Sequence, residues 1–387
     1  MATRRRMTIK EVAQAAGVST QTVSRVLNNR PDVAFETLER VRQIIADTGY
    51  TPNMLARSLT QGRSHIIGVV GYGLDYFGPS RVLTGIEQQA ADLGYAISLN
   101  LIHDPETRDV DGLLSSLFSR QVDGIIWAIP EVGENRVWSH GKGPELPLPV
   151  VLVGGMGGQT SLLSIAIDNA AIGRIATEHL LAGTAHRVGI ITGPLSWWEA
   201  RQRMLGWRGA LEAHGLTADE QPVAIGDWSP NSGEQGLYEL LDKQPDLDAV
   251  FASNDQMALG VLHAAHRLGR RVPEDLAVVG VDNTAEASHF WPSLTTVHQP
   301  LRDAGALAVR EIDLSIAAAP GSRRAVGTTP SLAVLLEPEL IVRESSRSVE
   351  SVGSKSNGRD LEILDGSDQV PGSPQDRLPV SPSDSVP

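Results

Sequence analysis

Residues 8–28, TIKEVAQAAGVSTQTVSRVLN, decide the fold of the N-terminal part of the chain. Thr8 and Glu11 have the spacing of a capping box, in which two residues satisfy backbone N–H groups at the start of a helix. Apolar residues then recur at helical spacing as far as Gly17, which predicts one short helix followed by a tight turn. A second helix begins after Ser19, a residue type favoured as an N-cap. Two short helices joined by a glycine turn predict a helix-turn-helix.

The second of these helices has an exposed face suited to reading DNA. Arg25 has the donors for guanine and Gln21 has the amide for adenine, and Thr20 lies beside them, so we expect these three to contact base edges in the major groove. On an arbitrary surface helix the same side chains would be merely solvated, and the surrounding motif decides against that alternative. We expect backbone positioning on DNA, rather than base reading, from Thr8, Ser19, Thr22, Ser24 and Asn28.

The charge distribution agrees with DNA binding by one end of the chain. Residues 1–63 contain ten Lys and Arg against five Asp and Glu, whereas the remainder of the 387-residue chain contains 23 and 41. A basic head on an acidic body indicates that only the head meets phosphate. A third helix is expected at residues 35–48, ended by Gly49, and Ala34 stands at its start without a capping side chain.

From Ser64 onward, apolar runs alternate with amphipathic stretches, which is typical of a parallel α/β architecture. There are more strands than one sheet needs, so we predict a small all-α head and a two-lobed α/β core with parallel sheets and a cleft. The expected strands lie near 66–70, 96–101, 124–127, 150–153, 188–191, 249–252 and 277–281, and the expected helices near 81–93, 169–181, 200–214 and 256–268.

The expected domains follow from these patterns. The head is residues 1–49 and the hinge is 50–63, where a short helix too marginal to fold alone is predicted. The core is 64–343, and a Ser-, Gly- and Pro-rich tail, 344–387, is expected to be disordered. Within the core, we assign 64–165 and 293–326 to the N-lobe, and 166–292 and 327–343 to the C-lobe.

Several other function classes are disfavoured by the sequence. The basic start is not followed by an apolar run, so we expect neither export nor a membrane span, and a cytoplasmic protein. Residues 68–73, GVVGYG, follow a strand but lack the spacing of a dinucleotide fingerprint. Because no metal-ligand spacing, P-loop or nucleophile elbow is found, we expect no enzyme activity, cofactor or metal. The main rivals are a transport-type sugar-binding protein and a nucleotide-binding enzyme.

Residues 8–13 and 17–28 resemble the signature of the lac and galactose repressor family, and parts of the core resemble its lac-repressor branch. Further resemblance extends over residues 7–343, in YTPN at 50–53, ARSL at 56–59, SNDQMALG at 253–260, VGVDN at 279–283 and PSLTTV at 292–297. The resemblance implies a periplasmic-binding-protein-like core and a homodimer that binds near-palindromic operator DNA. It also implies a hinge in which Leu59, with Ala56, enters the minor groove.

The sequence departs from the family pattern in two places that affect function. The tail lacks the leucine heptads with which a tetrameric member ends, which favours a dimer. Val153 and Gly154 stand where an acidic sugar-binding residue is expected, so a β-galactoside effector is not assumed. A sugar or sugar derivative remains the favoured effector, with a nucleoside or purine as the competitor. The expected effector-binding residues are Tyr76, Phe77, Ser80, Arg201, Trp228, Asn254, Asp282 and Gln299.

Overall fold

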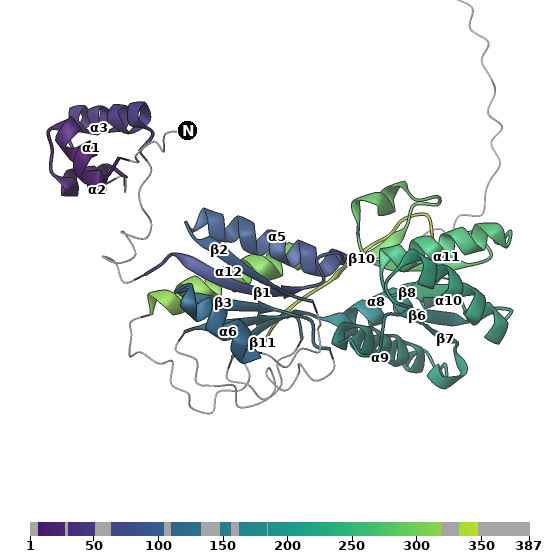
Figure 1. Ribbon diagram of the computed structural model, residues 1–387. Coiled ribbons are helices and arrows are strands. Elements are labelled where there is room, and N and C mark those ends of the chain that lie inside the picture. The colour runs from purple at the N-terminus through teal and green to yellow at the C-terminus, as the bar shows by residue number, and fades with distance from the viewer. Residues whose placement is uncertain are drawn as a thin grey trace, which may run out of the picture. The chain divides into compact units, whose positions relative to one another are not determined.

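The computed structural model describes residues 7–27, 30–50, 63–103, 110–132, 148–155, 162–183, 185–318 and 333–346. The head contains three helices, α1 (Ile9–Ala16), α2 (Thr20–Leu27) and α3 (Phe35–Thr48) (Figure 1). Val12, Val23 and Val41 form the fully buried centre of their core. Tyr50 packs on this cluster and its N–H donates to the carbonyl of Ile45. The head therefore includes Tyr50, which lies just beyond the expected boundary at 49.

The N-lobe is a six-stranded sheet in which every described pairing is parallel. Its order is β11 (Ala333–Leu336), β5 (Leu163–Ile167), β4 (Val150–Val153), β3 (Gly124–Ala128), β1 (Ile66–Tyr72) and β2 (Ala96–Ile102). Side chains alternate across a strand, so neighbouring residues pack on opposite faces. Val69 and Ile126 face α5 (Phe77–Asp92) and α12 (Leu301–Ala317), whereas Val70 and Ile125 face α6 (Val110–Ser119).

The C-lobe repeats this plan with a second six-stranded sheet. Its order is β12 (Glu339–Ile341), β10 (Thr295–His298), β9 (Ala277–Asp282), β8 (Ala249–Ala252), β6 (Val188–Thr192) and β7 (Val223–Ile225), and β12 alone is antiparallel among the described pairings. One face is covered by α8 (Asn169–Ala182) and α9 (Trp198–Ala213), the other by α10 (Pro230–Lys243) and α11 (Asp255–Arg267). Two short 3-10 helices, η2 (Ala218–Glu220) and η3 (Ala285–His289), complete the lobe.

The expected strands and helices of the core are present, but three expected boundaries are corrected by the strand pairing. β10 pairs with β9 and so lies in the C-lobe, not the N-lobe. β11 pairs with β5 and so lies in the N-lobe, because the chain crosses back before β12. Ser345 and Ser346 are buried against the C-lobe, where Ser345 Oγ donates to the Val278 carbonyl, so the ordered core continues past 343.

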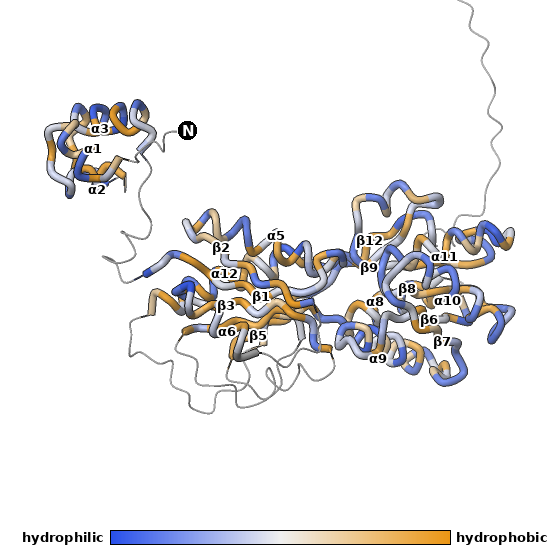
Figure 2. The backbone as a smooth tube through the Cα atoms, in the orientation of Figure 1, coloured by the Kyte–Doolittle hydropathy of each residue, from blue (hydrophilic) through white to orange (hydrophobic). Residues whose placement is uncertain are grey.

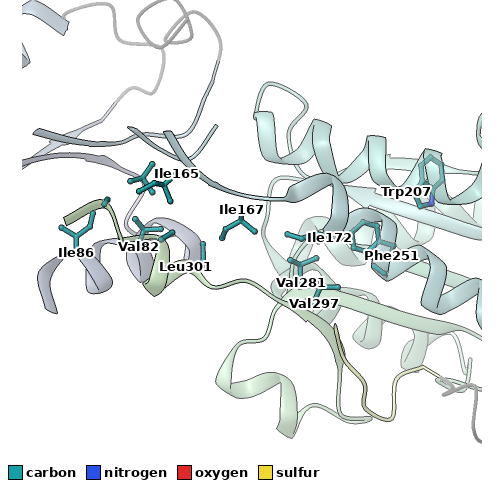
Figure 3. Close-up of a cluster of buried hydrophobic side chains, with 14 of the residues drawn as sticks. Val82, Ile86, Ile165, Ile167, Ile172, Trp207, Phe251, Val281, Val297 and Leu301 are labelled. Carbon is teal, nitrogen blue, oxygen red and sulfur yellow. The ribbon is translucent and has the colours of Figure 1, made fainter. Parts of the chain in front are cut away.

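One cluster of buried apolar side chains runs through both lobes. Figure 3 shows it from Val82 and Ile165 in the N-lobe, through Ile167, to Phe251 and Trp207 in the C-lobe. Figure 2 shows the corresponding pattern along the backbone, with hydrophobic strands inside and hydrophilic stretches on the covering helices. The lobes are thus joined by packed side chains as well as by connecting chain.

Candidate functional site

The strand order of each lobe creates a switch point, and the two switch points contribute to one cavity. In the N-lobe β1 lies between β2 and β3, and in the C-lobe β6 lies between β7 and β8. Successive connections leave such a central strand in opposite directions, which opens a crevice beyond the carboxyl ends of the strands. A cavity with about 940 Å³ of unfilled space, part of it continuous with solvent, is lined by the segments that follow these strand ends.

Arg203 is the centre of the polar part of the cavity. It is 5% exposed and donates from Nε to Asn169 Oδ1 at 2.8 Å, from Nη1 to the Ser253 carbonyl, and from Nη2 to Gln299 Oε1 at 3.2 Å. Gln299 in turn donates to Asp282 Oδ1 at 2.5 Å. These bonds join residues of α8, α9 and the ends of β8, β9 and β10 into one buried network, which fixes the guanidinium in place.

The ionisable groups of this network are perturbed by their burial. Burial raises the pKa of Asp282 to about 7, and the positive charge of Arg203 opposes that shift. Burial also lowers the pKa of Arg203, which the Asp282 carboxylate opposes. Buried opposite charges with strongly shifted pKa values are frequent at functional sites.

Trp228 forms one wall of the cavity and is held in an unusual conformation. Its backbone has a φ of 74°, and its carbonyl accepts a hydrogen bond from Asn254 Nδ2 at 3.0 Å. A side chain at Gly193 would overlap the Trp228 ring, so glycine there lets the ring lie flat on the strand end. The Arg203 guanidinium lies 5.6 Å from the centroid of this ring, within cation–π distance.

Aromatic side chains from both lobes continue this wall. Tyr76, at the start of α5, meets Trp197 edge-on with ring centroids 5.3 Å apart, and Trp197 meets Trp228 at 5.8 Å. Glu199, in the first turn of α9, also lines the cavity, and its Oε2 is shielded from solvent. Burial raises the pKa of Glu199; Arg203 opposes that shift and the nearby Glu131 carboxylate adds to it. The cavity therefore combines aromatic faces with hydrogen-bonding groups, the combination that binds sugar rings.

Six of the eight expected effector residues line this cavity. They are Tyr76, Phe77, Trp228, Asn254, Asp282 and Gln299.

Ser80 and Arg201 do not line the cavity. Ser80 Oγ donates to the Phe77 carbonyl within α5, and Arg201 Nη1 donates to the carbonyls of Leu195 and Ser196. On α9 it is Arg203, not Arg201, that points inward, because the buried face of this helix runs through Ala200, Arg203 and Trp207. That three- and four-residue spacing is a sequence signal that identifies Arg203.

Glu199 and Trp197 have no such signal. An acidic residue such as Glu199 in a first helical turn is common for its effect on the helix dipole alone, and Trp197 precedes the helix and so is outside its periodic pattern. Val153 and Gly154, the positions without the expected acid, do line the cavity.

Asp255, the first residue of α11, holds this helix against neighbouring elements. The cap is Asn254, whose Oδ1 accepts from the N–H of Met257, and the helix begins at Asp255. Asp255 is fully buried, accepts from Thr296 Oγ1 at 2.6 Å and from the N–H of Thr284 at 2.8 Å, and so ties α11 to β10 and to the loop after β9. Burial raises its pKa to about 6.

The head presents the expected face of α2. Thr20, Gln21 and Arg25 are exposed. Arg25 forms an ion pair with Asp32 at 3.6 Å, in which both side chains remain more than half exposed. Because such an exposed ion pair contributes little to stability, it does not fix the position of the Arg25 side chain.

The expected positioning residues contribute to the helix starts of the head. Ser19 Oγ accepts from the N–H of Thr22 at 3.1 Å and caps α2, and Thr8 and Glu11 form the capping box of α1. Ala34 precedes α3 without a side-chain cap, as its residue type predicts. Asn28 and the hinge residues Ala56 and Leu59 lie outside the described residues.

The described part of the chain contains neither a cluster of metal-binding side chains nor a membrane-spanning helix. No group of three or more His, Asp or Glu side chains there is arranged to hold a metal ion. No described helix has the length and apolar character needed to cross a bilayer.

Comparison with known proteins gives matches over both parts of the chain. Residues 8–53 match the family described as bacterial regulatory proteins, lacI family, and residues 177–346 match the periplasmic binding protein-like domain. The lactose operon repressor of Escherichia coli (strain K12) is 32% identical over 305 residues, which cover 78% of this chain and 83% of that protein.

Two solved structures are similar to this chain over most of its length. The crystal structure of the lac repressor dimer bound to operator and the anti-inducer ONPF has a TM-score of 0.73 and 31% identity, and covers 88% of this chain and 99% of that chain. The complex of the transcriptional regulator CelR with cellobiose has a TM-score of 0.63 and 32% identity, and covers 88% of this chain and 100% of that chain. From the helical head, the two-lobed core and these likenesses, we conclude that the chain belongs to the lacI family of bacterial regulatory proteins.

Proposed function

We propose that the protein is a sequence-specific transcriptional repressor whose affinity for operator DNA is controlled by a small sugar-like molecule bound between the lobes of the core. The observation that carries this proposal is the pairing, in one chain, of an exposed α2 face with a cavity lined by both lobes. Thr20, Gln21 and Arg25 would contact base edges, and Ser19, Thr22, Ser24, Asn28 and Thr8 would position the head on the backbone.

Control would follow from the way in which the cavity is divided between the lobes. Tyr76 and Phe77 come from the N-lobe, and Arg203, Asn254 and Asp282 come from the C-lobe. A ligand that touches both sets favours one relative arrangement of the lobes, and it shifts the population only by its unequal affinity for the two arrangements. In a homodimer, that shift would change the spacing of the two heads and hence the fit to a near-palindromic operator. Ala56 and Leu59 of the two hinges would enter the minor groove at its centre.

The family assignment favours regulation over the rival functions. The core alone is compatible with a transport-type sugar-binding protein, but the same chain carries the lacI-type head. A non-enzymatic protein acting in the cytoplasm, without a cofactor, is part of the proposal. A sugar is favoured over a nucleoside by the aromatic wall and by the cellobiose bound to the relative CelR.

Fluorescence anisotropy of the purified protein with its own promoter DNA tests this function. We expect tight binding to the promoter fragment and binding weaker by about three orders of magnitude or more to scrambled DNA at the same salt concentration. Equal affinity for the two DNAs at every salt concentration would contradict a sequence-specific repressor.

A further inference from the structure

The N-lobe holds the chain firmly at the point where it arrives from the hinge. The Asp123 carboxylate accepts from the N–H and Oγ of Ser64 at 2.9 and 3.0 Å, and from the N–H of His65 at 2.8 Å. Ser64 and His65 are the two residues directly before β1. His65 has a φ of 56°, in the left-handed region that a side chain disfavours, and such a conformation persists only where surrounding bonds hold it.

Arg63, the last residue of the expected hinge, is bonded to the C-terminal end of α12. Its Nη2 donates to the carbonyl of Ile316 at 2.7 Å, although the two residues are 253 positions apart in the sequence. Carbonyls in the last turn of a helix have no partner within the helix, and the helix dipole favours a cation beside them. The last turn of α12 contains no basic residue of its own, so Arg63 supplies that cation from outside the helix.

A second bond ties α12 to the same corner of the N-lobe. Asp313, one turn before Ile316, accepts from Tyr95 Oη at 2.9 Å, and the centroids of the Tyr95 and His65 rings are 5.7 Å apart. Burial and the bond to Asp313 raise the pKa of Tyr95 to about 12, so the phenol stays protonated and keeps donating at neutral pH. The end of the hinge and the end of α12 are thus held by one connected set of bonds.

Helix α12 extends from this corner to the cavity. Leu301 and Ala304 of its first turn line the cavity, whereas its last turn accepts the bond from Arg63. The 17 residues of the helix span about 25 Å. A Cβ at Gly305 would overlap the carbonyl oxygen of Val82, so α12 lies in close backbone contact with α5. The end of the hinge is therefore attached to an element that a ligand in the cavity would also contact.

We propose that Arg63 is a positioning residue for operator binding, and that its bond to α12, together with the bonds of Asp123, fixes the point at which the hinge leaves the core. A hinge whose last residue is already held loses less conformational entropy when it orders on DNA. The alternative role for a basic residue at this place is a phosphate contact, which would act on every DNA sequence alike. This inference rests on the proposed repressor function and names the residues that hold its hinge.

The test measures binding of the full-length protein to promoter and scrambled DNA by fluorescence anisotropy at several salt concentrations. We expect Arg63→Ala to weaken promoter binding about 5- to 50-fold, since each subunit of the dimer loses one bond, and to change binding to scrambled DNA less than about twofold. The slope of log Kd against log salt concentration should stay unchanged, whereas loss of a phosphate contact would lower it by about one per subunit. Arg63→Lys keeps a charged donor and should weaken promoter binding less than Arg63→Ala.

Arg310→Ala is the matched control, because it removes another exposed arginine of the N-lobe, from α12 itself. Arg310 Nε donates to Gln89 Oε1 at 2.9 Å, so this variant also loses an arginine hydrogen bond, but one that does not hold the hinge. It should leave both DNA affinities unchanged. Since Arg63 is exposed, Arg63→Ala should also leave the free energy of unfolding nearly unchanged, which urea denaturation checks.

Asp123→Asn tests the same proposal with the opposite change of charge. It removes a negative charge, which by electrostatics alone would strengthen binding to any DNA. Whichever way the amide turns, however, its NH₂ group faces a backbone N–H of Ser64 or His65 in place of an accepting oxygen. We therefore expect weaker promoter binding and no loss of affinity for scrambled DNA, in a variant that circular dichroism shows to be folded.

Three results would overturn the positioning role of Arg63. They are unchanged promoter affinity in Arg63→Ala, an equal loss of affinity for both DNAs with a lower salt slope, and promoter binding in Asp123→Asn that is unchanged or tighter. Failure of the repressor function is distinct from these results, because it would appear as equal affinity of the unchanged protein for the two DNAs.

Discussion

At the scale of single residues, the proposed DNA-reading face of α2 contains one side chain, Arg25, that is held by an exposed ion pair. Its partner is Asp32, so little free energy would be lost if the guanidinium left Asp32 for a guanine, as the proposed function requires. We expect Arg25→Ala to weaken promoter binding by about 1–3 kcal/mol and to reduce discrimination against scrambled DNA. Fluorescence-anisotropy titrations of the variant with promoter DNA and with scrambled DNA measure both the affinity and the discrimination.

The control for that prediction is Arg42→Ala, which removes the same charge from α3 of the head, where Arg42 pairs with Glu39 at 3.7 Å. It should change the affinities for promoter and scrambled DNA by similar factors, because a loss of charge acts without regard to sequence. If Arg25→Ala also weakened binding to promoter and scrambled DNA by equal factors, Arg25 would contact a phosphate and would not read a base.

The buried carboxyl of Asp282 gives stability a defined pH dependence. Its pKa rises to about 7 in the folded protein, above the value of about 3.9 expected in the unfolded chain. Between these values the folded state binds more protons, so the contribution of Asp282 to the free energy of unfolding decreases as pH rises from about 4 to 7. Asp282→Asn should flatten this decrease in urea denaturation series recorded across that range.

Asp275 provides the opposite case for comparison. Its hydrogen bonds with Arg271 hold its pKa well below the usual range, so its contribution is present above about pH 4 and is lost on acidification. Asp275→Asn should leave the decrease between pH 4 and 7 in place. If the free energy of unfolding fell equally steeply between pH 4 and 7 in Asp282→Asn and in the unchanged protein, the assignment of this decrease to Asp282 would be contradicted.

The residues of the cavity were only partly predictable from the sequence. Trp228, Asn254 and Asp282 follow strand ends, where α/β sheets place their ligands, and so were expected. Arg201 was expected in the cavity and Arg203 was not, although the helical period places Arg203 with Trp207 on the buried face. Glu199 could not be found, because an acid in a first helical turn is common for its effect on the helix dipole alone, and only the fold places it at the cavity.

At the scale of elements, closely packed helix pairs hold the cavity walls in place. A Cβ at Gly206 of α9 would overlap the carbonyl oxygen of Ala170 in α8, whereas a Cβ at Gly209 would meet nothing within 4 Å. We expect Gly206→Ala to destabilise the core by about 1–3 kcal/mol through overpacking and to weaken effector binding, since α9 carries Arg203.

Gly209→Ala is the matched change on the same helix. It should stabilise the protein by about 0.5–1 kcal/mol, because alanine loses less backbone entropy than glycine in a helix. Urea denaturation of both variants checks the pair. Equal stabilities for Gly206→Ala and Gly209→Ala would show that α8 and α9 are not in such close contact.

The elements were more predictable than their assignment to lobes. Buried strands such as 188–191 and 249–252 stand out as short apolar runs, and helix α3 was expected with its bounds at 35 and 48. The predicted lobes of β10 and β11 were wrong. The chain crosses between the lobes before each of these strands, and the local sequence does not indicate which strand each one pairs with. Partner choice is set by tertiary packing.

At the scale of the whole molecule, the two lobes share both the cavity lining and one buried apolar cluster. The buried cluster passes through Ile167, at the crossing from β5 to α8, and Leu301, at the crossing from β10 to α12. Arg203 and Tyr76 line the cavity from opposite lobes, so a ligand that contacted both would act near these crossings. Packed interiors deform in discrete steps, so a small change there can alter the relative arrangement of the lobes.

The most direct test of the account is the affinity for promoter DNA with and without a saturating concentration of the compound that most strongly changes the cavity tryptophan fluorescence. The account predicts that this compound changes the dissociation constant for the promoter about 5- to 150-fold, which corresponds to the usual 1–3 kcal/mol of coupling, and that promoter DNA changes the affinity for the compound by the same factor. A compound that binds the cavity tightly and leaves promoter affinity unchanged would contradict it.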